Sequence, residues 1–302
     1  MHQSDDVRSQ LKLHFVVFLW GFTAILGDLI SLDAIPLVAH RMFIAVVAIY
    51  IFLKYKKTST AVKGAMRYKL YAAGGVIALH WITFFHAIKI SNVSITLACM
   101  GSAALFVSIL EPIFFKRKVA WSEILLGVAV IIGVSTIFWS ENDYATGIIV
   151  ALISAFLSAS FSVINGLLVK KESSAVITVH ELFGGWALVA LFLTATILFS
   201  DRTVESIVPT LPDVGYLMLL GILATAYAFI QSVEVMRHLS PFTVVLTINL
   251  EPVYGILAAY LILGDEEKMS KEFYFGTLII LAAVVTNGWL KRKRKRKLAQ
   301  QQ

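Results

Sequence analysis

The chain contains ten apolar runs, each long enough to cross a lipid bilayer as a helix. They cover roughly residues 11–31, 36–54, 69–89, 92–115, 120–139, 145–169, 175–199, 213–236, 241–263 and 273–290. A hydrocarbon layer about 30 Å thick needs about 20 apolar residues, and within it only a helix lets a single segment satisfy its own backbone hydrogen bonds. The composition agrees, because 58% of the residues are hydrophobic and only 15% are charged. The sequence therefore predicts an all-α integral membrane protein with ten transmembrane helices.

The basic residues fall in alternate connections between these runs. Most of the 26 lysines and arginines lie before the first run or after an even-numbered run, whereas acidic loops such as 141–143 and 265–267 fall on the other side. Short loops rich in Lys and Arg stay on the cytoplasmic side of a membrane. We therefore expect a multi-pass protein of the cell inner (cytoplasmic) membrane, with residues 1–10 and 291–302 as cytoplasmic tails.

Residues 291–297 are all Lys or Arg, and the formal net charge of the chain is +7. Such a run resembles a nucleic-acid-binding tag, but directly after a membrane span it is more simply explained as an anchor on anionic lipid headgroups. We expect a contact with the bilayer here and no nucleic-acid partner. The sequence leaves the oligomeric state open.

The stretch 88–134 has the same layout as the stretch 237–283. An ungapped comparison pairs Ser91 with Ser240, Leu97 with Leu246, Glu123 with Glu272 and Gly127 with Gly276. The two halves, 11–140 and 145–290, then hold five spans each, and an odd number of spans inserts the second half from the opposite face. We therefore expect two inverted five-helix repeats around a central cavity, as in transporters whose substrate site lies between repeats.

Polar and aromatic residues in the middle of four runs are the candidates for that site. At 1.5 Å per residue, the bilayer midplane lies about ten residues into a span. Phe84 shares a helix face with His80. The predicted substrate contacts at this depth are Trp20, His80, Trp81, Phe84, Tyr227, Asn249 and Glu251.

Glu251 is the sharpest candidate among them. A carboxylate at this depth costs at least about 2.5 kcal/mol to insert and should therefore face a partner or a wet cavity. Pro252 offers no N–H to the carbonyl of Ile248, so it should free that oxygen and kink the helix. The two features together would suit an ammonium group or a proton. The alternative is an internal ion pair or a hydrogen bond between helices.

Four residues are candidates for gating or coupling: Arg41, His86, Glu181 and Pro252. Arg41 in the first half corresponds to Glu181 in the second, and an inverted arrangement places Arg41 near the outer surface and Glu181 near the inner one. Arg41 could instead snorkel outward, and the histidines of the third run could simply belong to an aromatic packing stripe. The candidate partners are a small-molecule substrate and a coupling ion such as a proton.

The sequence lacks the residue patterns that are typical of zinc sites, ATP-binding sites and catalytic centres. No His pair has the H-E-x-x-H spacing of a zinc site, no G-x-x-x-x-G-K-[ST] motif is present to bind ATP phosphates, and no nucleophile–base pair stands out. We therefore expect no cofactor, no metal and no catalytic residue, and predict that the protein is not an enzyme. Two alternatives stay open: a membrane-embedded enzyme that uses His80, His86 or Glu251, and a non-transporting scaffold or sensor.

The segment 78–94, which contains His80 and Trp81, is the most specific part of the chain. Further markers are Trp20-Gly21, His40-Arg41, Pro252 and the Glu-x-x-x-Gly openings of the fifth and tenth runs. Together these residues resemble the EamA-type exporters of the drug/metabolite transporter superfamily, over about residues 11–291.

This resemblance implies a ten-helix inverted repeat, substrate contacts from His80 and Trp81, and transport of small metabolites or amino acids, often outward. The family often has Pro in the middle of the fourth span, where this chain has Ala103. We therefore expect a secondary active transporter, an exporter that works by alternating access between its two halves.

Overall fold

The computed structural model describes residues 2–62, 64–116, 121–200 and 202–299, and every regular element in these ranges is helical. The first half contains α1 (His2–Gly21), α2 (Thr23–Leu29), α3 (Ala34–Tyr55), α4 (Gly64–Ile90), α5 (Val93–Met100), α6 (Ala103–Phe115) and α7 (Trp121–Ser140). The second half contains α8 (Ala145–Leu168), α9 (Ser174–Phe199), α10 (Leu211–Gly221), a π-helical turn (Ile222–Tyr227), α11 (Ala228–Val235), α12 (Pro241–Ile248), α13 (Glu251–Leu263) and α14 (Lys271–Ala299). Short 3-10 turns lie at Asn142–Tyr144, Glu205–Ile207 and Gly264–Glu267.

Eight segments of the described chain are long and apolar enough to cross a membrane. They are Val7–Leu29, Ala34–Tyr55, Gly64–Ile90, Val93–Phe115, Asn142–Leu168, Ser174–Phe199, Leu211–Val235 and Thr243–Leu263. Helices α7 and α14 cover the other two predicted runs. Large hydrophobic side chains face outward, such as Ile51 (62% exposed) and Leu191 (69% exposed). The expected all-helical, multi-pass membrane architecture is therefore confirmed, whereas the count of ten spans and their inverted orientation stay predictions.

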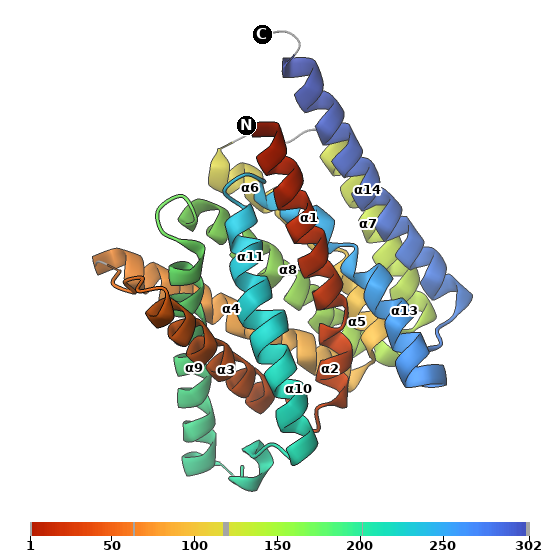
Figure 1. Cartoon of the computed structure of the whole chain (residues 1–302). Helices are drawn as coiled ribbons and strands as arrows, with labels where there is room; N and C mark the ends of the chain where they lie inside the picture. The colour runs from red at the N-terminus through yellow and green to blue at the C-terminus, as the bar shows by residue number, and fades with distance from the viewer. Residues whose placement is uncertain (1, 63, 117–120, 201, 300–302) are drawn as a thin grey trace.

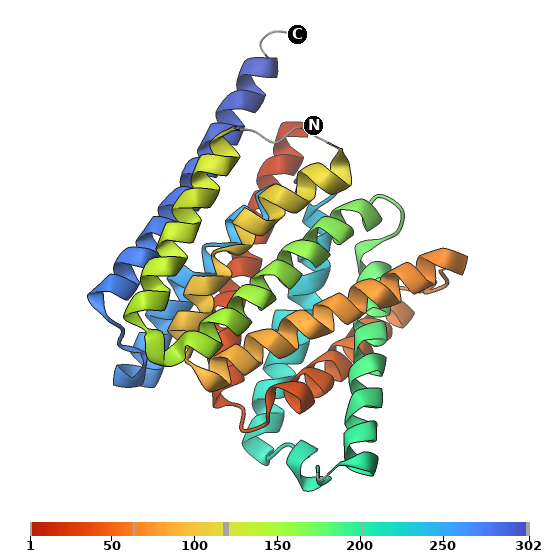
Figure 2. The same cartoon turned by 180° about the vertical axis from the view of Figure 1, so that it is seen from behind.

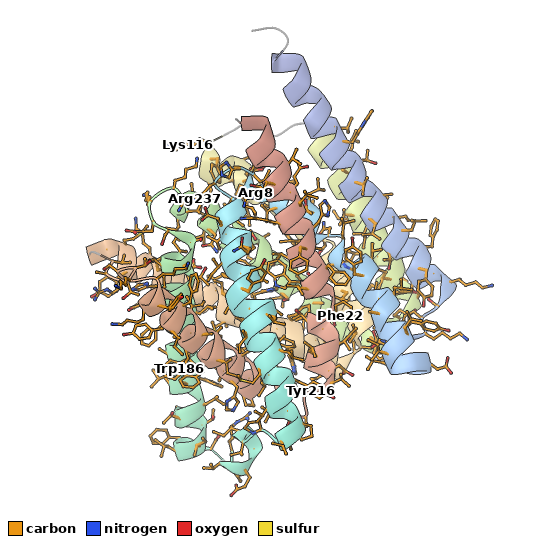
Figure 3. All side chains as sticks on the ribbon, viewed as in Figure 1. Arg8, Phe22, Lys116, Trp186, Tyr216 and Arg237 are labelled. Atoms are coloured by element: carbon orange, nitrogen blue, oxygen red, sulfur yellow. The ribbon has the colours of Figure 1, made fainter. Side chains whose placement is uncertain are left out.

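Helices from the two halves of the sequence pack against each other throughout the bundle. Helix α4 contacts α8 and α9, α3 contacts α9 and α10, and α1 contacts α11, α12 and α13. Helices α7 and α14 lie side by side along one edge, and the start of α1 and the end of α14 lie at the same end of the bundle (Figures 1 and 2). Arg8, Lys116 and Arg237, from three of the predicted cytoplasmic clusters, also lie toward that end (Figure 3).

Glycines allow two of these helix pairs to approach closely. A Cβ on Gly74 of α4 would lie 2.9 Å from the backbone nitrogen of Gly185 of α9. Likewise, a Cβ on Gly133 of α7 would lie 2.8 Å from the carbonyl oxygen of Gly276 of α14. Small residues at such crossings let helix backbones touch, which is how helices commonly associate in a membrane.

Four of the membrane-crossing segments are interrupted near the middle. The breaks fall at Phe22 between α1 and α2, at 101–102 between α5 and α6, at the π-helical turn between α10 and α11, and at 249–250 between α12 and α13. Interrupted helices are tolerated at membrane depth where the backbone is buried in protein or lines a cavity. These four interruptions therefore mark the level at which a site is to be sought.

The breaks at 101–102 and 249–250 lie at nearly the same place in the two halves. The Asn249 side-chain amide joins them, since its Nδ2 donates to the carbonyl oxygen of Gly101 at 3.0 Å. Only the second break is followed closely by a proline, Pro252. The presence of Ala103 where the family often has Pro has therefore not prevented an interruption of the fourth span.

Candidate functional site

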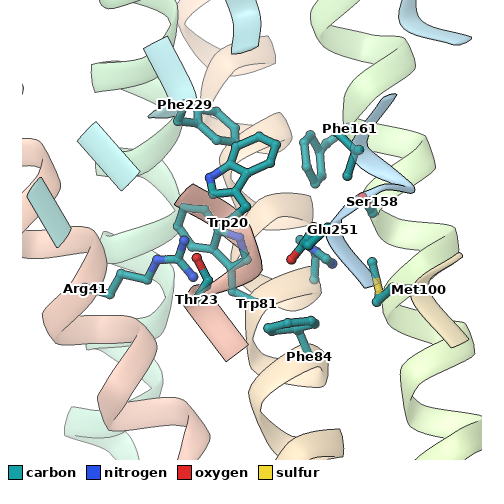
Figure 4. Close-up of a pocket in the computed structure, with 12 residues that line it drawn as sticks. Trp20, Thr23, Arg41, Trp81, Phe84, Met100, Ser158, Phe161, Phe229 and Glu251 are labelled. Carbon is teal, nitrogen blue, oxygen red and sulfur yellow. The ribbon is translucent and has the colours of Figure 1, made fainter. Parts of the chain in front are cut away.

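A small cavity lies among the interrupted helices and is lined from both halves. Its volume is about 60 Å³, and one water needs at least roughly 10–15 Å³ of such space, so the cavity can hold a few waters or a small polar group. The lining residues are Trp20, Thr23, Arg41, His80, Trp81, Phe84, Met100, Ser158, Phe161, Phe229, Ile248 and Glu251 (Figure 4).

Arg41 of α3 contributes a buried cation to the cavity wall. The residue is only 2% exposed, and its Nε donates to Thr225 Oγ1 at 2.6 Å. Its guanidinium carbon lies 3.9 Å from the centre of a Trp81 ring, and a desolvated cation–π contact of this kind contributes about 2 kcal/mol. Within the described part of the chain, its Nη1 has no hydrogen-bond partner. The guanidinium is therefore held from one side and can still donate to an anionic group.

The π-helical turn supplies the acceptors that hold this wall together. Thr225 Oγ1 accepts from Arg41 and donates to the carbonyl oxygen of Leu220 at 2.7 Å. The carbonyl oxygen of Ala224 accepts from Trp20 Nε1 at 2.8 Å. Local π-helical turns often occur at functional sites because they alter the ordinary hydrogen-bond ladder of the helix. Here the turn binds side chains from α1 and α3 of the other half.

Glu251 provides the opposite charge from the second half. It is the first residue of α13, where the helix dipole favours a negative charge. Figure 4 shows Arg41 and Glu251 on different sides of the cavity that both residues line. Pro252 lies in the first turn of α13, where a missing N–H removes no helical hydrogen bond. The chain therefore stops one helix and starts another here, which corrects the expected kink in a continuous helix.

His80 of α4 is fixed by a reciprocal contact with Ser154 of α8. Its Nδ1 lies 2.8 Å from Ser154 Oγ and 3.0 Å from the Ser154 carbonyl oxygen. The Ser154 hydroxyl donates its one proton to the carbonyl oxygen of His80 at 2.9 Å. The His80 Nδ1–H must therefore be the donor to Ser154, and in the neutral ring Nε2 is the acceptor. The rings of Phe84 and Phe161 lie 6.1 and 5.3 Å from the imidazole centre.

Five of the seven predicted substrate contacts meet in this cavity, namely Trp20, His80, Trp81, Phe84 and Glu251. Tyr227 does not, because it is 43% exposed and its ring packs 6.3 Å from that of Phe15. Asn249 is buried, but its amide is occupied by the Gly101 carbonyl rather than directed to the cavity lining. Both residues were selected by their depth along a span, but depth does not decide which side of the helix faces the cavity.

The four predicted gating residues lie in different surroundings. Arg41 lines the cavity and does not snorkel outward, because Thr225 and Trp81 bind its guanidinium. Pro252 is buried at the start of α13. His86 is exposed on α4, and Glu181 is fully buried on α9; neither lines the cavity. Their roles in gating or coupling stay predictions.

Sequence reasoning missed several lining residues, among them Thr23, Met100, Ser158, Phe161, Phe229 and Ile248. The apolar ones could not be separated from ordinary packing residues by pattern. Ser158 did carry a signal, because Ser154 and Ser158 are four residues apart and therefore share one face of an otherwise apolar helix.

Comparisons with known proteins agree with this architecture. The model of the EamA-like transporter family matches residues 10–139 and 145–289. A solved structure described as "Crystal structure of protein" superposes with a TM-score of 0.69 over 95% of this chain and 98% of that chain, at 15% identity, which supports the fold alone. The search of curated proteins returned no match. Because the family model covers both halves of the sequence, this chain belongs to the EamA-like transporter family.

Proposed function

We propose that the protein is a secondary active transporter that exports a small polar metabolite or amino acid. Family membership establishes the broader class, a membrane transporter of the drug/metabolite transporter superfamily. The observation that carries the finer proposal is the presence of a basic and an acidic side chain at one cavity, Arg41 from the first half and Glu251 from the second.

An amino acid has charges that complement this pair. Its ammonium group would lie against Glu251, and its carboxylate would accept from Arg41 Nη1, which has no other partner among the described residues. His80 Nε2 would act as a further acceptor, and Trp81 would pack against the apolar part of the substrate. A ligand that meets both charges avoids leaving either ion desolvated and alone, which costs several kcal/mol by order of magnitude.

Polar links between the halves support alternating access. At the end where α2 finishes, Asp213 accepts from the backbone nitrogen and hydroxyl of Ser31 at 2.8 and 2.7 Å. Glu267 accepts from the backbone nitrogens of Val93 and Ser94 at 2.9 and 2.8 Å. Each link joins one half to the other, so we assign this conformation as closed at that end. Rocking of two inverted five-helix halves would break these links while the opposite end closes.

The basic residues indicate which end of the helix bundle would face the cytoplasm. The end that carries Arg8, Lys116 and Arg237 (Figure 3) would face the cytoplasm across the inner membrane. Both tails would then be cytoplasmic, with residues 291–297 against anionic headgroups. Export would therefore proceed toward the end closed by Asp213 and Glu267.

Transport measurements on cells and liposomes test the proposal. Metabolites are compared inside and outside cells with and without the protein, and the compound whose distribution changes is then assayed with purified protein in liposomes. Glu251→Gln should lose most of the transport while still folding. The matched control is Glu234→Gln, which removes an exposed carboxylate that pairs with Arg237 at 3.1 Å. This variant should keep the transport activity. Unchanged transport by Glu251→Gln would remove Glu251 from the mechanism, and product formation without net movement would favour an enzyme.

A further inference from the structure

A second buried polar cluster lies outside the cavity, on α8 and α9. It consists of Ser162 and Asn165 of α8 (each 1% exposed) and Thr178 and Glu181 of α9 (each 0% exposed). Asn165 lies close enough to Glu181 to influence its carboxyl group. Nevertheless, within the described chain no polar side-chain atom of these four residues makes a hydrogen bond of ordinary geometry. Buried polar groups are nearly always paired, so this concentration of unpaired atoms calls for a ligand or a function.

Within the described residues, no cationic side chain donates a hydrogen bond to either carboxyl oxygen of Glu181. Several titratable groups on the helices that pack against α9 have partners of their own. Arg41 of α3 binds Thr225, His80 of α4 binds Ser154, Tyr71 of α4 stacks on His180, and Glu234 of α11 pairs with Arg237. The backbone of α4 also crosses α9 closely at this level, because a Cβ on Gly74 would overlap the main-chain carbonyl oxygen of Glu181.

A row of polar side chains on α8 connects this cluster to the cavity. Ser154, Ser158 and Ser162 are four residues apart, and Asn165 follows three residues later, so all four share one helix face. Ser154 holds His80, and Ser158 lines the cavity. At 1.5 Å per residue, Asn165 lies about 10 Å along the helix from Ser158. All four side chains are buried, so the row runs through the interior of the protein.

We infer that Glu181 is a proton-binding site that couples proton movement to transport and is reached from the cavity along this face of α8. The coupling role rests on the proposed function; the binding of the proton does not. An ionised carboxylate without a cation is far more costly in apolar surroundings than the neutral acid. The neutral acid also fits its neighbour, because its O–H can donate to Asn165 Oδ1 while Asn165 Nδ2 donates to its other oxygen.

The exchange is a simple proton transfer. When the site has access to one side of the membrane, a proton from water forms an O–H bond on the Glu181 carboxylate. When the halves rock, that bond breaks and the proton passes to water on the other side. An exporter of this kind would exchange an inward-moving proton for an outward-moving substrate.

Infrared spectroscopy of the purified protein in liposomes tests proton binding without any need for transport. The wild type should show the C=O stretching band of protonated carboxylic acids at neutral pH, and the difference spectrum between wild type and Glu181→Gln should show the loss of the Glu181 contribution. The matched control Glu234→Gln, at an exposed and paired acid, should leave the band in place. Asn165→Ala keeps the acid but removes its neighbour, so it should shift the band, which keeps the test decisive if Glu181→Gln folds poorly.

Two outcomes of this experiment would overturn proton binding: the absence of such a band from the wild type, and a band that Glu181→Gln and Asn165→Ala both leave unchanged. A separate thermal-unfolding measurement gives a third, a stabilisation by Na⁺ that Glu181→Gln abolishes. The last result would show that the carboxylate is ionised and paired with a metal cation.

Proton flux tests the coupling role. Liposomes that contain the protein and the pH dye pyranine receive a mixture of the standard amino acids. The wild type should move protons in the direction opposite to the amino acids. Glu181→Gln should lower the proton flux at least tenfold and still exchange amino acids at equal concentrations on both sides. Retained proton flux in Glu181→Gln would refute coupling. Failure of the wild type to move any amino acid would count against both the proposed function and coupling, while the infrared result stands by itself.

Discussion

Thr225→Val removes the hydroxyl that holds Arg41 in the cavity wall while nearly keeping the shape of the side chain. Thr225 Oγ1 accepts from Arg41 Nε at 2.6 Å and donates to the Leu220 carbonyl oxygen at 2.7 Å, and all of these contacts are buried. Arg41 Nη1 already has no partner among the described residues. The substitution therefore leaves a desolvated guanidinium with its cation–π contact to Trp81 as the main remaining restraint.

The expected loss of stability follows from the two hydrogen bonds. A hydrogen bond to a charged group contributes about 1.5–3 kcal/mol, and a neutral hydrogen bond inside a membrane protein averages about 0.6 kcal/mol. Thr225→Val should therefore lower the free energy of unfolding by about 2–3.5 kcal/mol. Thr194→Val is the matched control, because Thr194 is exposed on α9 and its hydroxyl donates only to the Ala190 carbonyl at 2.8 Å. Its effect should stay within about 0.5 kcal/mol.

Equilibrium unfolding of the purified variants in mixed detergent micelles provides the measurement. The free energies of the two valine variants are compared with that of the wild type under identical conditions. A loss for Thr225→Val no larger than that for Thr194→Val would show that Thr225 does not hold the guanidinium, and the account of the cavity wall would fail with it.

Three further substitutions test other parts of the structure by the same unfolding measurement. Glu267→Gln should lower the free energy of unfolding by about 1–2 kcal/mol, because a neutral amide cannot replace the charge-assisted bonds to the two backbone nitrogens at the start of α5. An unchanged free energy of unfolding would show that Glu267 does not link the two halves. Asn249→Ala should cost about 1 kcal/mol by leaving the buried Gly101 carbonyl without its donor, and no loss would mean that the two helix breaks are held independently. Gly74→Ala should cost about 1–3 kcal/mol through a clash with the backbone of α9, whereas Gly215→Ala on α10, where no atom lies within 4 Å of the added Cβ, should be neutral or stabilising. Equal effects of the two alanines would contradict the close α4–α9 crossing.

The depth of the site could be predicted from the sequence, but its composition could be predicted only in part. Counting residues into each span selected Trp20, His80 and Glu251, which line the cavity. The same count selected Tyr227, which packs against Phe15 outside the cavity. Residue depth depends on rise per residue alone, whereas the direction of a side chain depends on helix rotation, which the packing of neighbouring helices decides.

The burial of Arg41 could not be predicted from the sequence either. Near the end of an apolar run, an arginine can snorkel to the surface, and nothing in the neighbouring sequence forbids it. Its burial results from an acceptor almost two hundred positions away, Thr225 on the π-helical turn. A contact between residues so distant in sequence leaves no local pattern.

The sequence by itself determined the class of the protein, because long apolar runs can cross a membrane only as helices with their backbone bonds satisfied internally. Its residues also carried the family resemblance that the family model then confirmed. Only the tertiary structure decided that Arg41 and Glu251 share one cavity and that Glu181 is buried beside Asn165. The physical reason is that every apolar run satisfies the bilayer equally well in any rotation, so the contacts between helices choose which polar side chains face one another.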